Sequence, residues 1–407
     1  MNLMPESKSP VTQRGSTRRP LRVLQLVAML FNGGPERWLV DLCYLGPAQG
    51  LSMDLAVIWD IKGIFATKAQ ELGIPVYRCP AGSPVKFIAN LRKLLRKHGP
   101  YDAIHCHLHA FSCFAMIAAK LEGVPIRVAH SHNVVGNVSG SLGRRAYITM
   151  ARALLGRFAT AGLAPSAASL EDLFGPRWRL DKRWRVMPCG IDLEPFRGPL
   201  PLSSFREDFG IPRDALLLGS VGRLVPEKNS EFLVDVLAEA LRLRADTYMV
   251  LIGEGPLRER LLQKAAESCF SDRLILPGTR DDVAALMRSV IDVFVFPSPP
   301  PPRGNEALPI AVVEAQAAGL QIVVSDGIPA EAVLAPELVV QIKADTSPAE
   351  WAEVVIQQSR RRSRYSPGFD TVSEKAFDVI SKSDHNCVVS LRHLAAIYRG
   401  RSDTTER

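Results

Sequence analysis

The sequence predicts an α/β protein with two Rossmann-like domains in tandem. Short apolar runs rich in β-branched residues alternate with helical patterns along most of the chain, which is typical of parallel βαβ units. A stretch rich in Pro, Ser and Gly near residues 195–212 separates two such series. The 407 residues suit two to three domains, and an apolar content of 47% is enough for two cores.

The first series carries seven predicted strands. A Gly-Gly turn follows the first strand and leads into a helical pattern over residues 35–45. Basic amphipathic helices are predicted at residues 87–99 and 144–158. The strands are expected within residues 22–30, 53–59, 75–79, 101–107 and 126–132, with short strands at 162–166 and 184–191 closing the series.

The second series begins with a strand in residues 215–224, followed by a helix over 230–243. Further strands are expected in residues 248–256, 273–278, 292–298 and 321–326, and the chain beyond Ser347 is expected to be helical. We therefore divide the chain into a disordered basic tail (1–20), a first domain (21–195) and a second domain (196–387). A C-terminal helix near 388–400 is expected to join the first domain.

Composition excludes several classes of protein. No run of 18 apolar residues is present, so no transmembrane helix is expected, and the polar N-terminus lacks the apolar region of a signal peptide. The seven cysteines form no CxxC pair, which favours buried reduced thiols. The formal charge of +8 suits an anionic partner, but nucleic-acid motifs are absent. A cytoplasmic protein is expected.

The segment EALPIAVVEAQAAG carries two carboxylates, Glu306 and Glu314, eight positions apart on either side of a helix start. Pro309 is expected in the first helical turn, where free N–H groups can hold a phosphate. A nucleotide sugar lying along Leu308, Pro309 and Ile310 could offer its sugar hydroxyls to one carboxylate and its ribose hydroxyls to the other. Two solvated surface glutamates are the alternative.

This segment resembles the retaining glycosyltransferases of family 4, which have the GT-B architecture of two Rossmann-like domains facing across a cleft. The resemblance covers roughly residues 21–345 and is greatest to bacterial exopolysaccharide enzymes. It implies a nucleotide-sugar donor, with UDP as the expected nucleotide, bound by the second domain. It also implies a saccharide or lipid-linked acceptor on the first domain, and front-face transfer in which the donor phosphate helps deprotonate the acceptor.

The remaining motifs agree with the resemblance. In GSVGRLVPEKN, Gly222, Arg223 and Lys228 match the family's diphosphate clamp. Gly33 and Gly34 in GGPER match its loop for the diphosphate or acceptor. Gly253, Glu254, Gly278 and Thr279 resemble its nucleotide-side loops. Either His130 or His132 is implied near the transferred sugar, with His132 preferred.

Two further patterns bear on metal ions and on the donor pocket. The triplet His105, His107 and His109 has a spacing that metal sites also use, but no acidic pattern accompanies it, and no DxD motif is present. Neither a metal nor another cofactor is expected. The stretch PPPPRGN before Glu306 departs from the family and could reshape the donor-sugar pocket.

Two alternative functions and one expectation of membrane contact complete the sequence analysis. A nucleotide-sugar 2-epimerase of the same architecture and a catalytically inactive partner subunit stay open as alternatives. The two basic helices are expected to hold the protein at an anionic membrane as a peripheral protein, the alternative being that their apolar faces pack on the sheet.

Overall fold

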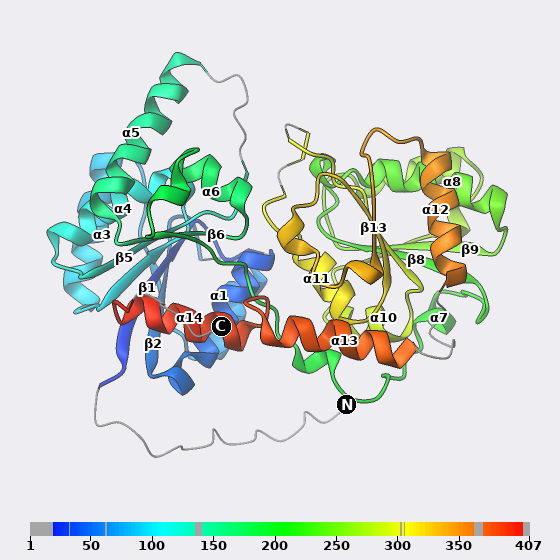
Figure 1. Cartoon of the computed structure of the whole chain (residues 1–407), viewed down its shortest axis with the longest axis horizontal. Helices are drawn as coiled ribbons and strands as arrows, with labels where there is room; N and C mark the ends of the chain where they lie inside the picture. The colour runs from blue at the N-terminus through cyan, green and yellow to red at the C-terminus, as the bar shows by residue number, and fades with distance from the viewer. Residues whose placement is uncertain are drawn as a thin grey trace.

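The computed structural model describes residues 19–31, 33–61, 63–134, 141–301, 303–304, 306–361 and 369–401. Two parallel sheets dominate it, each covered by helices on both faces (Figure 1). Of the predicted disordered tail, only Arg19 and Pro20 fall within these residues, and the Arg19 guanidinium lies 2.8 Å from the Asp102 carboxylate.

The first sheet has seven strands in the order β3-β2-β1-β4-β5-β6-β7. Every neighbouring pair is parallel, as buried strands joined by helical crossovers require. The strands are β1 (Leu21–Val27), β2 (Leu51–Val57), β3 (Val76–Arg78), β4 (Ala103–Cys106), β5 (Ile126–His130), β6 (Ala161–Ala164) and β7 (Trp184–Val186).

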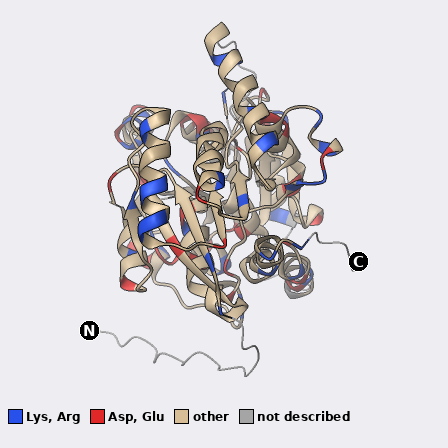
Figure 2. Ribbon diagram, turned by 90° about the vertical axis from the view of Figure 1, so that its left-hand side faces the viewer, with Lys and Arg blue, Asp and Glu red and all other residues tan. Residues whose placement is uncertain are grey.

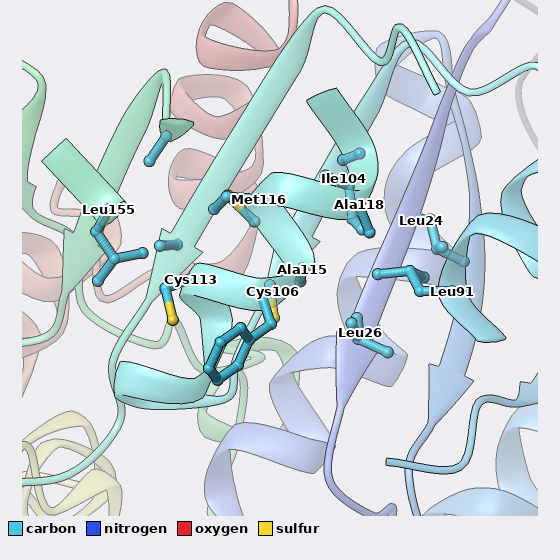
Figure 3. Close-up of a cluster of buried hydrophobic side chains, with 14 of the residues drawn as sticks. Leu24, Leu26, Leu91, Ile104, Cys106, Cys113, Ala115, Met116, Ala118 and Leu155 are labelled. Carbon is cyan, nitrogen blue, oxygen red and sulfur yellow. The ribbon is translucent and has the colours of Figure 1, made fainter. Parts of the chain in front are cut away.

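Two apolar cores cover the faces of this sheet. Figure 3 shows part of one core, where Leu24 and Leu26 of β1 meet Leu91, Met116 and other side chains from the helices. The helices are α1 (Gly34–Leu45), α2 (Ile64–Glu71), α3 (Pro84–His98), α4 (Ser112–Leu121), α5 (Leu142–Phe158) and α6 (Ala167–Phe174).

The second sheet has six strands in the order β10-β9-β8-β11-β12-β13. One strand, β13 (Val339–Ile342), is absent from the sequence prediction, which overlooked the short β-branched run VVQI at this edge of the sheet. The others are β8 (Leu216–Val221), β9 (Thr247–Ile252), β10 (Leu274–Gly278), β11 (Val293–Phe296) and β12 (Gln321–Ser325). Its helices are α7 (Phe205–Asp208), α8 (Ser230–Leu243), α9 (Arg258–Glu267), α10 (Val283–Ser289), α11 (Ile310–Ala317), α12 (Pro348–Arg361) and α13 (Phe369–Lys382).

The chain returns to the first sheet at its C-terminal end. Helix α14 (Cys387–Tyr398) packs against α1, with Leu391 and Leu394 buried in the same core as the α1 side chains (Figure 1). The segment that leaves the first domain and the segment that returns to it are hydrogen-bonded to each other. The Ile191 N–H donates to the His385 carbonyl at 2.7 Å, and the Cys387 N–H donates to the Ile191 carbonyl at 3.0 Å. A Cβ on Gly190 would overlap the Cys387 backbone, so this crossing needs a glycine.

The carboxyl ends of the two sheets face each other. The loop after β1 contacts the segment after β11. The two lie so close that a Cβ on Gly34 would overlap the Ile310 side chain. The start of α6, after β6, contacts the loop after β12, because the Ala167 N–H donates to the Glu331 carboxylate at 2.7 Å. In open parallel sheets ligands bind outside the carboxyl ends of the strands, next to the point where the strand order reverses.

Candidate active site

Three loops of the second sheet stack beside one another at this edge. Gly222 and Arg223 follow β8, Gly253 and Glu254 follow β9, and Gly278 ends β10 with Thr279 exposed behind it. The Gly253 N–H donates to the Gly278 carbonyl at 2.9 Å, and a Cβ on Gly253 would overlap the Gly222 backbone. The structure thus brings together the predicted glycines of the nucleotide side in one layer of backbone.

Arg223 and Lys228 lie at the reversal of strand order between β8 and β11. Both line a small pocket with Ser220, Gly222 and Phe296. Arg223 is exposed, whereas Lys228 is half-buried with its Nζ 5.3 Å from the centre of the Phe296 ring. Two cations at a sheet edge that ligands can reach are suited to binding an anion.

Glu306 joins the same group. The Lys228 ammonium donates to Glu306 Oε1, and the Ser298 hydroxyl lies 3.4 Å from that oxygen. Lys228 and Glu306 belong to separate sequence motifs, and the structure brings them into contact. Of the PPPPRGN stretch, Pro302 and Asn305 lie outside the described residues.

Helix α11 begins just after Pro309, which was expected in its first turn. Pro309 occupies the position before the helix, which starts at Ile310, because the proline backbone there is extended with ψ at 99°. Among the described residues no side chain caps this helix start, so its first N–H groups are available to a ligand. Leu308 and Ile310 are half-buried beside it.

Glu314 lies in a different environment from Glu306. Its carboxylate is 3.6 Å from the Arg37 guanidinium of α1, so the two halves of the chain share an ion pair here. Burial raises the pKa of Glu314, and Arg37 opposes that shift. The structure therefore separates the two carboxylates, with one beside Lys228 and the other facing the first sheet.

The Gly33–Gly34 loop lies opposite Arg223. Gly33 precedes α1 with an extended backbone, and Glu36 lies in the first turn of that helix. Burial raises the pKa of Glu36, and the charge of Arg223 acts in the other direction. Sequence reasoning quoted GGPER as a motif but assigned no role to Glu36 or Arg37, although both lie at this interface.

Four imidazoles converge at the carboxyl ends of β4 and β5. His105 Nε2 is 3.1 Å from His130 Nδ1, and His107 Nδ1 is 2.8 Å from His132 Nε2. His105 and His130 are buried, whereas His132 is half-buried. The Trp38 ring lies edge-on to three of them, 5.6 Å from His130, 6.0 Å from His132 and 6.3 Å from His107.

Burial keeps this cluster neutral. Desolvation lowers the pKa of His105, His107 and His130 well below the ordinary value, and lowers that of His132 to about 3. Ligand atoms of His105, His107 and His130 all lie within 4.8 Å of one another, so by residue type and spacing this set could hold a metal ion. The predicted triplet divides, because His109 turns aside to Asp172, 2.9 Å away.

Comparisons with known proteins agree with this geometry. The family model described as "Glycosyltransferase Family 4" matches residues 32–195, and that described as "Glycosyl transferases group 1" matches residues 203–363. The "Putative glycosyltransferase EpsF" of Bacillus subtilis is 30% identical over 82% of this chain and 86% of its own length. An Escherichia coli "UDP-Gal:alpha-D-GlcNAc-diphosphoundecaprenol alpha-1,3-galactosyltransferase" is 30% identical over 60% of this chain and 62% of its own length.

Solved structures show the same fold. Anabaena HepE in complex with UDP has a TM-score of 0.75 at 20% identity, covering 93% of this chain and 100% of its own. WaaG, a glycosyltransferase involved in lipopolysaccharide biosynthesis, has a TM-score of 0.69 at 19% identity over 93% of this chain and 100% of its own. The prediction of a GT-B fold with two Rossmann-like domains is confirmed.

Proposed function

The chain belongs to glycosyltransferase family 4, and on this premise we propose that it transfers a hexose from a UDP-sugar to a polysaccharide precursor or glycolipid, with retention of configuration. The observation that carries the proposal is the group formed by Arg223, Lys228 and Glu306 at the strand-order reversal of the second sheet. The related structure of HepE was solved in complex with UDP, which supports UDP as the nucleotide.

In this proposal the second domain, residues 196–387, holds the donor. Departure of the nucleoside diphosphate develops negative charge on its oxygens, and Arg223 and Lys228 stabilise that charge more in the transition state than in the ground state. The start of α11 holds phosphate oxygens, and Glu306 accepts hydrogen bonds from sugar hydroxyls. The loops at Gly253, Glu254, Gly278 and Thr279 border the nucleotide, and Glu314 exchanges its ion pair with Arg37 for hydrogen bonds from the ribose hydroxyls.

The first domain, residues 21–195 with α14, holds the acceptor in this proposal. Gly33 and Gly34 lie opposite Arg223, where an acceptor hydroxyl can meet the donor sugar. A phosphate oxygen of the leaving group takes the hydroxyl proton on the face from which the diphosphate departs. The Escherichia coli relative acts, by its name, on a diphosphoundecaprenol-linked sugar, which favours a lipid-linked acceptor here.

A ligand panel tests the donor site without knowledge of the acceptor. UDP and UDP-sugars should raise the melting temperature of the protein by mass action, and GDP should raise it less. The same shift should disappear in a Lys228→Ala variant. Equal shifts from all nucleoside diphosphates would contradict the choice of UDP, and no shift from any of them would contradict the donor site itself.

We propose that the reaction needs no metal ion, since Arg223, Lys228 and a helix start supply the positive charge that a metal gives to other transferases. Turnover should survive excess EDTA. Activity that EDTA abolishes and Mn²⁺ or Mg²⁺ restores would contradict this proposal and draw attention to the imidazole cluster.

The structure contradicts the prediction of membrane contact for one of the two basic helices. Helix α3 was expected to insert its apolar face into lipid, but Phe87, Leu91, Leu94 and Leu95 are buried in the core of the first sheet. Arg92 and Arg96 both bind the Glu122 carboxylate, at 2.6 and 2.7 Å. The alternative is therefore right for α3, whose apolar face is not available to lipid. No described helix has the length and apolar content needed to cross a bilayer.

Helix α5 differs from α3, because apolar and basic side chains in its first half are exposed. Its first half projects beyond the body of the first domain (Figures 1 and 2), and Leu142 is 83% exposed beside the exposed Arg144 and Arg145. We propose that this half of α5 contacts the anionic surface that carries a lipid-linked acceptor. Each cation near such a surface contributes about 1 kcal/mol.

Co-sedimentation with vesicles tests the role of α5. Binding should require anionic lipid, weaken with salt and fall when Arg144 and Arg145 become Gln. Lys93→Gln with Lys97→Gln is the matched control, because it removes the same charge from exposed positions on α3. Equal losses from both pairs would indicate attraction by net charge rather than by α5.

A further inference from the structure

The imidazole cluster ends on two side chains, Gln25 and Tyr398, that decide which ring nitrogens carry protons. Gln25 of β1 lies between His107 and Tyr398 of α14, with Oε1 3.0 Å from His107 Nε2 and Nε2 3.1 Å from the Tyr398 hydroxyl. The Tyr398 hydroxyl lies 2.6 Å from His105 Nδ1. Gln25 and Tyr398 are both buried, so water does not compete for these bonds.

The orientation of the Gln25 amide follows from its third neighbour. Gln25 Nε2 also lies 3.4 Å from the Met53 sulfur, and a thioether can only accept a hydrogen bond. The amide side that faces both Met53 and Tyr398 is therefore the NH₂ group, and the carbonyl oxygen faces His107. Amide orientation must be assigned from such partners.

One branch of the cluster is then fixed through His107. Because Gln25 Oε1 accepts, His107 Nε2 must donate, and a neutral His107 has an unprotonated Nδ1. His107 Nδ1 accepts from His132 Nε2, so the proton of His132 is on Nε2. His132 Nδ1 is unprotonated and faces the Cys189 sulfur at 3.4 Å, a thiol that burial keeps protonated by raising its pKa.

The other branch is fixed through Tyr398. The Tyr398 oxygen accepts from Gln25, so its proton goes to His105 Nδ1. His105 then donates from Nε2 to His130 Nδ1, which leaves the proton of His130 on Nε2. Among the described residues His130 Nε2 has no hydrogen-bond partner, and the Met187 backbone only partly opposes the larger effect of burial, which lowers the pKa of this ring.

We infer that Gln25 is a positioning residue that acts through His107 and fixes His132 with its proton on Nε2 and an acceptor on Nδ1 that faces the Cys189 thiol. The thiol that faces His132 Nδ1 is a weak donor, so a ligand hydroxyl displaces it with little loss. His132 therefore offers an acceptor to a hydroxyl group and cannot donate from that nitrogen. The assignment of that hydroxyl to the transferred sugar rests on the proposed function, whereas the tautomers do not.

The ring nitrogens of the cluster also distinguish a hydrogen-bonded chain from a metal site. His105 and His107 each use both ring nitrogens in hydrogen bonds. A metal ion on His105, His107 and His130 would break some of these bonds, and it would replace a proton on at least one Nε2 or turn a ring. The tautomers of the protein without added metal thus distinguish the two arrangements.

Two-bond ¹H–¹⁵N spectra of ¹⁵N-histidine protein, without substrate, test the inference directly. His105, His107, His130 and His132 should each show a protonated Nε2 and an unprotonated Nδ1, with signals assigned from single His→Gln variants. A proton on Nδ1 of His107 or His132 would overturn the inference. So would an Nε2 of His107 that carries no proton.

Variants of Gln25 then test the positioning role. Gln25→Leu should mix the tautomers of His107 and His132 and lower turnover about 10-fold, the equivalent of one hydrogen bond. Gln25→Glu keeps the acceptor for His107 and should preserve both tautomers and most of the turnover. Tyr398→Phe should disturb His105 and His130 but leave His107 and His132 unchanged.

Tyr101→Phe is the matched control, because it removes another buried hydroxyl, 2.6 Å from the Asp54 carboxylate, outside the cluster. It should cost stability and change no tautomer. If Gln25→Leu leaves His107 and His132 in single tautomers, the inference fails. If the tautomers change while turnover does not, the contact of His132 with the sugar fails, and the donor-binding panel separately decides the proposed function.

Discussion

The two sheets bring opposite kinds of chemistry to the edge where they meet. The first sheet presents four imidazoles that burial keeps neutral and that hydrogen bonds hold in one arrangement. The second presents Arg223, Lys228 and Glu306, which are charged and partly open to solvent. A group that sets geometry must be rigid and need not be charged, whereas a group that stabilises a leaving diphosphate must be charged and within its reach.

The largest expected effect concerns acid stability of the first sheet. Because burial lowers the pKa of the four imidazoles, the unfolded chain binds more protons than the folded chain below the ordinary histidine pKa. Their contribution is therefore complete above about pH 6.5 and is lost as the pH falls through the lowered pKa values, of which that of His132 is about 3. Each imidazole should lower the free energy of unfolding by up to about 1.4 kcal/mol per pH unit.

Urea unfolding between about pH 7 and pH 5 measures this loss. His107→Gln should make the pH dependence shallower, and His98→Gln, a change at a half-buried imidazole outside the cluster, should not. The same slope in both variants would show that the cluster does not control acid stability.

The next largest effect should come from the charged residues of the second sheet, whose loss should lower turnover. Lys228→Ala and Arg223→Ala should each lower turnover by about 100-fold or more, because each removes charge stabilisation from the transition state. Lys264→Ala is the control, since it removes a lysine that pairs with Asp235 in the same domain. Near-normal turnover in either variant would remove that residue from the diphosphate clamp.

A smaller effect should come from the contact between the halves. Gly34→Ala would place a methyl group on the Ile310 side chain, and overpacking of this kind costs about 1–3 kcal/mol. Thermal unfolding should show the loss, and Ile310→Val should restore part of it in the double variant. Gly156→Ala, on α5 with nothing within 4 Å, should be neutral or stabilising. A Gly34→Ala protein as stable as the wild type would mean that the halves move apart freely.

The smallest effect should come from the Arg37–Glu314 ion pair. Arg37 is 44% exposed and the pair is 3.6 Å apart, so Arg37→Gln should change the free energy of unfolding by at most about 1 kcal/mol. A larger loss would show that this pair, rather than apolar contact at Ile310, holds the two halves together.

Local sequence determined the helices and strands and the residues in the loops that follow the strands. Apolar runs alternating with helical patterns specify buried parallel strands. The glycines and charged residues after β1, β8 and β11 were indicated by the motifs GGPER, GRLVPEK and EALP and by their resemblance to a known family. The prediction missed β13, although its four residues VVQI are mostly β-branched and were visible in the sequence. The roles of the predicted site residues stay predictions.

Tertiary structure alone decided the partners. Gln25 and Tyr398 are 373 positions apart and meet only because α14 returns to the first sheet. Lys228 finds Glu306 across 78 positions, and Glu314 turns to Arg37 instead of joining Glu306. Helical periodicity showed that α3 has an apolar face but could not show that the sheet, rather than lipid, covers it. Periodicity depends on neighbours within a few positions, whereas these contacts depend on strand order and on the path of the chain between sheets, which no local pattern encodes.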